Sequence, residues 1–116
     1  MIRVPEYVDG YFELYQIVED TSKDYPVETL KDMRMQIWFR EISVFDRIRY
    51  EFEQGGKEIT MKIRIPRFNE IDSKCACKID EKIHIVYNAA SVMSKEGFKE
   101  TELTLIRPGK DLKIDG

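Results

Sequence analysis

The most informative pattern in the chain is an alternation of apolar and polar residues in short runs between Met33 and Leu105. In the run 58–65 the apolar side chains share one face, and the polar side chains share the other. The apolar positions are Ile59, Met61, Ile63 and Ile65. A period of two is that of a β-strand with one buried face. Several such strands separated by turn residues predict a mainly β fold, a small β-barrel-like or sandwich domain of about six strands.

The other strands follow from the same pattern. They are predicted over 11–19, 33–42, 74–79, 82–88 and 98–106. Alternation in 33–42 places the only tryptophan, Trp38, on an otherwise polar face. Its ring either caps the sheet edge or packs under a helix, or it is exposed for a partner. Asp80 and Glu81 are predicted to form a tight hairpin turn. The segment 108–116 is predicted to be frayed, which leaves an ordered core of about 11–107.

One short helix is predicted over 43–56, where the period changes. Ser43 is the predicted N-cap, Asp46 follows in the first turn, and Gly55 and Gly56 end the helix. The apolar residues at helical spacing are Val44, Phe45, Ile48 and Phe52. This stripe indicates either a helix packed on the sheet or a segment that orders only in an assembly.

A long exposed loop is predicted over Asp20–Asp32. The segment is polar, and its Pro26 disfavours helical geometry at the preceding residue. Loops of this length in small domains are often functional, although a plain surface connection is the alternative.

Length and composition bound the class of protein. The 116 residues fit a single domain, 1–116, and 35% of them are charged. The net charge is −3, with −5 in residues 1–32 and +2 in the remainder, which is too little positive charge for a general nucleic-acid binder. No run is apolar enough for a membrane span. Cys75 and Cys77 are expected to be reduced thiols in a cytoplasmic protein.

Candidate chemistry is sparse, so we expect no enzyme, no cofactor and no metal. Cys75, Cys77 and His84 are three potential zinc ligands, but the C-x-C spacing is not typical of zinc sites. No phosphate-binding glycine loop or zinc-protease motif is present. A modest basic strip is predicted from Arg34, Arg40, Lys62, Arg64 and Arg67. It is either a solvated sheet face or the surface of an OB-like nucleic-acid module.

The order of elements resembles a known family. An early strand and a loop precede the Trp38 strand, and a short helical stretch precedes the I-x-I strand. The motifs that follow are Ile71-Asp72, the hairpin 78–83, Ile85-Val86-Tyr87-Asn88 and Glu102-Leu103-Thr104-Leu105. This arrangement resembles the head-tail adaptor family, the head-closure or head-tail joining proteins of long-tailed bacteriophages and of prophages of Gram-positive bacteria.

The resemblance implies a structural virion protein with a small β-barrel-like fold and a short helix. Such a subunit joins a homo-oligomeric ring below the portal and its adaptor, helps to retain the packaged DNA through non-specific channel contacts, and presents a docking surface for the tail. It implies assembly in the host cytoplasm and a final location in the virion connector, and it leaves a monomer open for the isolated protein. The alternatives are a tail-completion or tail-terminator subunit and, from a different class, the OB-like module.

Two segments are the candidate partner-contact or channel elements under this resemblance. The closest positional match to the family's channel loop is 43–57, with candidate residues Phe45, Arg47, Arg49, Tyr50, Gly55 and Gly56. The other candidate is the predicted loop, with Asp20, Asp24, Tyr25 and Pro26.

Overall fold

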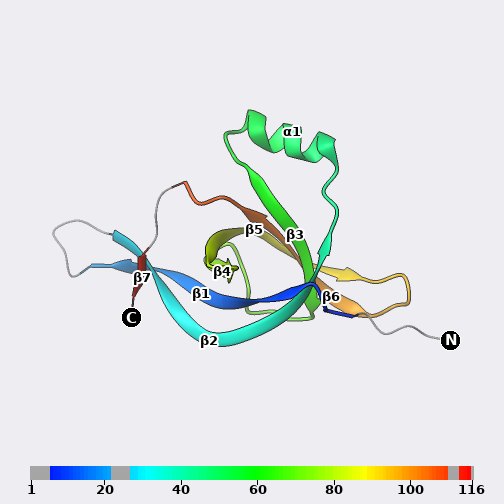
Figure 1. The fold of residues 1–116 in the computed structure, drawn as a ribbon, viewed down its shortest axis with the longest axis horizontal. Helices are drawn as coiled ribbons and strands as arrows, with labels where there is room; N and C mark the ends of the chain where they lie inside the picture. Colours follow the sequence, from blue (N-terminus) through cyan, green and yellow to red (C-terminus); the bar gives the residue numbers. More distant parts are fainter. Residues whose placement is uncertain (1–5, 22–26, 110–112, 116) are drawn as a thin grey trace.

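The computed structural model describes residues 6–21, 27–109 and 113–115. The strands are β1 (Gly10–Asp20), β2 (Val27–Ile42), β3 (Ile59–Pro66), β4 (Cys75–Ile79), β5 (Lys82–Met93), β6 (Lys99–Ile106) and β7 (Lys113–Asp115), and the helix is α1 (Asp46–Gln54). The fold is therefore mainly β with one short helix, as the alternation predicted (Figure 1).

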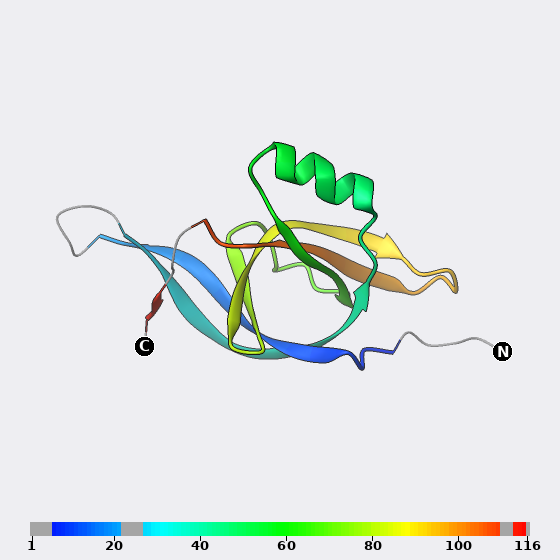
Figure 2. The same ribbon diagram turned by 45° about the horizontal axis from the view of Figure 1, so that its top comes forward.

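Six antiparallel strands form a barrel-like sheet. Their order is β1-β4-β5-β6-β3-β2, and β1 also pairs with β2, so that the pairing returns to its first strand. Figure 2 shows this arrangement as an uneven ring of strands. The pairing is extensive between β1 and β2, whereas β2 meets β3 only at residues 40–42. Outside the ring, β7 pairs in parallel with residues 29–31 of β2.

The main core lies inside this ring. It is built from the buried side chains Phe12, Leu14, Phe39, Ile63, Ile65, Ile71, Cys75, Cys77, Ile79, Val86, Leu103 and Leu105. The predicted apolar face of 58–65 is confirmed, because three of its four members are buried and Met61 packs against the core. A smaller cluster of Tyr15, Leu30 and Ala76 is formed separately, on the other face of β4, because Ala76 alternates with its neighbouring cysteines.

A bulge in β2 interrupts the pairing of β1 and β2. Glu13 lies opposite Gln36, but Tyr15 lies opposite Asp32, so that one residue of β1 is matched by three of β2. Arg34 in this bulge has a φ of 56° and donates its backbone N–H to Asp32 Oδ1 at 2.7 Å. The insertion is of two residues, so the alternation along β2 is kept. Leu30 and Phe39 lie on opposite faces of the strand and enter different clusters.

Two predicted segments are more regular than expected. The long loop over Asp20–Asp32 is wrong for Val27–Asp32, which forms the first part of β2 and pairs with β1. The frayed tail is wrong for residues 113–115, which form β7. In both cases the backbone pairs with another strand, β1 for Val27–Asp32 and β2 for residues 113–115. The period of a segment alone does not reveal such a partner.

The hairpins fit the turn chemistry of the sequence. Asp80 and Glu81 both have positive φ, at 50° and 66°, as a two-residue turn between paired antiparallel strands requires. The return strand, however, is longer than the predicted 82–88 and extends to Met93. Its extra residues pair with β6 across the turn at Ser94–Gly97.

Candidate functional site

Helix α1 projects from the barrel-like sheet between β2 and β3, as Figure 2 shows. Its N-cap is Phe45, whose carbonyl oxygen accepts the N–H of Ile48 at 3.0 Å. The predicted N-cap at Ser43 is wrong, and no side chain caps the first turn. The helix instead begins where the chain leaves β2, and Asp46 lies in the first turn, near the positive end of the helix dipole.

The predicted end of the helix is confirmed. Gly55 is the C-cap, and its N–H donates to the carbonyl oxygen of Phe52 at 3.0 Å. Gly56 has a φ of +80°, in the left-handed region that favours glycine. These two residues turn the chain toward β3, so that the excursion 43–58 leaves and re-enters the sheet within a short stretch.

The helix has two distinct sides but buries none of its residues. Ile48 and Phe52 face the sheet, as the predicted stripe requires. Phe45 departs from the stripe, because its side chain is 75% exposed, and Tyr50 on the helix is 63% exposed. The prediction that the helix packs on the sheet is therefore met only by its inner side, and two large aromatic side chains are left in solvent.

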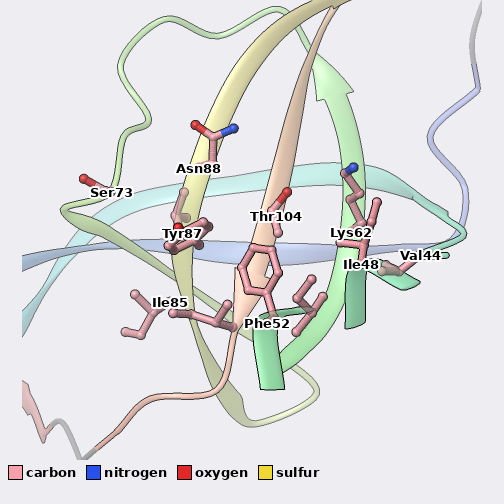
Figure 3. A pocket seen from close by; sticks show the side chains of 12 residues that line it. Val44, Ile48, Phe52, Lys62, Ser73, Ile85, Tyr87, Asn88 and Thr104 are labelled. Atoms are coloured by element: carbon pink, nitrogen blue, oxygen red, sulfur yellow. The ribbon is translucent and has the colours of Figure 1, made fainter. Parts of the chain in front are cut away.

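An apolar groove of about 680 Å³ separates the inner side of α1 from the sheet (Figure 3). Val44, Ile48 and Phe52 line one wall, and the other wall comes from Ile59, Lys62, Ser73, Ile85, Val86, Tyr87, Asn88, Thr104 and Ile106. The rings of Phe52 and Tyr87 meet edge to face at 4.9 Å between centroids. Lys57 Nζ lies 4.7 Å from the centroid of the Tyr87 ring. A few contacts of this kind hold the helix over the groove.

The candidate arginines of the helix have different surroundings. Arg49 donates from a guanidinium nitrogen to the carbonyl oxygen of Ile59 at 2.8 Å and so ties α1 to the start of β3. Arg47 is solvent-exposed and pairs with Glu51 one turn later at 3.3 Å. Arg49 is thus an anchor of the helix, whereas Arg47 belongs to its outer surface.

The candidate residues do not form a single site. Phe45, Arg47 and Tyr50 lie on the projecting helix, but Asp20 ends β1 in the hairpin that extends away from it (Figure 1). Asp24, Tyr25 and Pro26 lie outside the described residues.

A buried carboxylate, which the sequence analysis did not predict, organises the outer face of the sheet. Glu100 is fully buried, and its Oε1 accepts a hydrogen bond from Arg40 at 2.6 Å and lies 3.6 Å from Arg64. Its neighbour on the same face, Glu102, pairs with Arg64 at 3.1 Å and with Lys62 at 3.5 Å. Three of the five residues of the predicted basic strip, Arg40, Lys62 and Arg64, are therefore paired with carboxylates.

The N-terminal segment closes over this network. The Tyr7 hydroxyl donates to Glu100 Oε2 at 2.9 Å. Burial of the phenol and this hydrogen bond raise the pKa of Tyr7 to about 12. Arg40 Nε is buried without a hydrogen-bond partner among the described residues. The i, i+2 spacing of Glu100 and Glu102 on one strand opposite Arg64 was the only sequence signal, and it needs the strand register to be interpreted.

Trp38 is exposed rather than covered by a helix. Its ring is 53% exposed and packs against Tyr11, its cross-strand neighbour on β1, with 5.3 Å between ring centroids. The position of Trp38 under a helix is therefore wrong, and its exposure to a partner stays a prediction.

The residues considered for metal binding or catalysis are partly or fully buried within the fold. His84 Nδ1 lies 2.7 Å from the hydroxyl of Thr60, and burial lowers the His84 pKa. Cys75 and Cys77 are free, buried thiols whose pKa values are raised by burial. In the described part of the chain, no group of three or more His, Cys, Asp or Glu side chains is placed to hold a metal ion. None of the helical residues described forms a segment long and apolar enough to cross a membrane.

Comparison of the sequence with protein-family models gives no match, and no curated protein matches it.

Proposed function

We propose that this protein is a structural subunit of a phage head-tail connector, which binds below the portal and its adaptor, helps to retain packaged DNA and offers a docking surface for the tail. The observation that carries the proposal is helix α1, an amphipathic element inserted between the Trp38 strand and the Ile59 strand that buries none of its residues. A ring subunit uses such projecting elements because it makes its main contacts with neighbouring chains.

The outer side of α1 is the proposed contact surface. Phe45 and Tyr50 are large aromatic side chains with high exposure, and residues of this kind are frequent anchors of protein interfaces. Arg49 and the glycine end of the helix hold the element in place from below. Arg47, on the solvent side, is 89% exposed, and its pair with Glu51 is of the weak surface kind, so it can be exchanged for a contact with DNA phosphates in the channel.

This role requires no catalytic residue and no cofactor. It requires a homo-oligomeric ring built by heterologous contacts, formed in the host cytoplasm and retained in the virion. The ion pairs on the outer sheet face favour this role over an OB-like nucleic-acid module, because Arg40, Arg64 and Lys62 already contact the carboxylates of Glu100 and Glu102.

The test is an affinity pull-down of the tagged protein from a phage-infected or prophage-induced lysate, analysed by mass spectrometry. We expect recovery of the portal, its adaptor or a tail-completion protein. The double variant Phe45→Ser/Tyr50→Ser should lose most of this recovery. The matched control is Trp38→Ser, which removes an exposed aromatic side chain from a different surface.

The partners recovered separate the alternatives. A tail-tube protein without portal proteins would indicate a tail-completion or tail-terminator subunit. Nucleic acid without virion proteins, in a salt-dependent complex, would reject the connector and favour the OB-like module. Equal recovery by the helix variant and the control would reject α1 as the contact element.

A further inference from the structure

The second half of β5 has an open edge. Residues Lys82 to Ile85 of β5 pair with β4, and the pairing with β6 begins at Ile85. Beyond this point only β6 continues, in a regular register from Asn88 to Met93. No other described strand pairs with this edge, so its outward backbone N–H and C=O groups are available to another strand.

This edge lacks the usual protection against pairing. Exposed edge strands are normally shielded by charged residues or proline, lysine above all. The sequence from Ile83 to Ser94 contains no charged residue and no proline, in a chain of which 35% is charged. Met93 at the far end is 61% exposed. An uncharged, partly apolar edge of this kind is a template for strand addition.

The side chains along the edge are complementary to their own copy. Antiparallel pairing about a two-fold axis at Ser91 places Ser91 against itself, Ala90 against Val92, and Ala89 against Met93. Each larger side chain then faces a small one, and no like charges meet. This edge carries no charge that would select a strand of another protein, whereas its small and large side chains are complementary to those of a second copy of the chain.

We propose that the protein self-associates through this edge, with β5 of one copy paired antiparallel to β5 of another as an isologous dimer. The contact involves only five residues from each chain, 89–93, fewer than a standard interface contains, so the dimer is weak and depends on concentration. It is distinct from the heterologous contacts that a ring needs, and it does not rest on the proposed function.

The first measurement is sedimentation velocity of the purified full chain up to about 1 mM, a concentration at which even weak association is detected. We expect a concentration-dependent shift from one subunit mass to twice that mass. A single subunit mass over the whole range overturns the proposal and leaves the edge to a strand from another protein.

Charge substitutions then test the contact itself. Ser91→Lys and Ser91→Glu should each weaken the dimer by at least about fivefold, because like charges meet near the axis. A mixture of the two variants should regain dimers, which misfolded variants would not do. Gln36→Lys, on the exposed face of β2, is the matched control and should dimerise as the wild type does. Dimers that are unaffected by either Ser91 variant would place the contact elsewhere.

A cross-link tests the register. Paired Cα atoms across an antiparallel ladder lie about 4.5–5.5 Å apart, within the range that a disulfide spans. Ser91→Cys should therefore give a covalent dimer on mild oxidation, and Gln36→Cys should not. The native thiols, Cys75 and Cys77, are buried and do not compete. Equal cross-linking of the two variants would reject pairing at Ser91.

Discussion

Replacement of Glu100 by glutamine tests whether the buried carboxylate holds the outer face of the sheet together. The substitution keeps the size of the side chain but removes its charge from beside Arg40 at 2.6 Å and Arg64 at 3.6 Å. Loss of one partner from a buried ion pair costs about 3–5 kcal/mol. The two arginine side chains are 28% and 25% exposed, so water relieves part of this loss. We expect a decrease of about 2–3 kcal/mol in the free energy of unfolding.

Thermal and urea unfolding of the purified protein measure this change. For a domain of this size the loss corresponds to a decrease in Tm on the order of 10 °C. The control is Glu51→Gln, which removes the same charge from the exposed pair with Arg47 and should change stability by less than about 0.5 kcal/mol. A Glu100→Gln variant within about 0.5 kcal/mol of the wild type would refute the view that this network stabilises the fold.

The tyrosine of the network provides an independent measurement. The phenol of Tyr7 has a pKa of about 12, raised first by burial and then by its hydrogen bond to Glu100. An absorbance titration, corrected with Tyr7→Phe, should show this pKa falling in Glu100→Gln but remaining above 10, because burial persists. The folded protein keeps the phenol proton that the unfolded chain loses near pH 10. Stability contributed by Tyr7 is therefore complete below pH 10 and is lost between pH 10 and about 12. An unchanged titration in Glu100→Gln would mean that the hydrogen bond is absent in solution.

Three further predictions concern other parts of the fold. Burial and the nearby Lys82 lower the pKa of His84, so the stability that this residue contributes should be complete above pH 6.5 and decrease as the pH falls through the folded-state pKa. His84→Gln should reduce this pH dependence of stability. An NMR titration of the only imidazole should show a midpoint below 6.5. Gly56→Ala should destabilise the protein by about 1 kcal/mol because its φ is +80°, whereas Gly55→Ala, at a φ of −86°, should not, as urea unfolding of both variants would show. Leu30→Ala should cost about 2–5 kcal/mol in the same assay, since the side chain is fully buried; a loss below about 1 kcal/mol would mean that the smaller cluster is not packed in solution.

The candidate site was predictable only in part. The sequence placed a short helix between two strands and marked its glycine end, and the structure confirms both features. The exposure of Phe45 could not be predicted, because its spacing matched the apolar stripe. The groove below α1 depends on how far the helix stands from β5 and β6, a distance that no local pattern contains.

Local alternation by itself determined the class of fold, the strand predicted over 58–65 and observed at 59–66, and the buried face of β3. Turn chemistry determined the tight turn at Asp80 and Glu81. These features depend on residues close together in sequence, and period and turn chemistry report such contacts directly.

Tertiary structure decided the features that join distant segments. The first part of β2 extends past its predicted start because β1 pairs with it, and residues 113–115 are ordered against the same strand. Glu100 occupies a polar position of an alternating strand, which by itself indicates a solvated side chain. It is buried because strand pairing brings Arg40 and Arg64 onto the same face and Tyr7 covers it. Burial of a charge requires partners, and only the register of three strands supplies them.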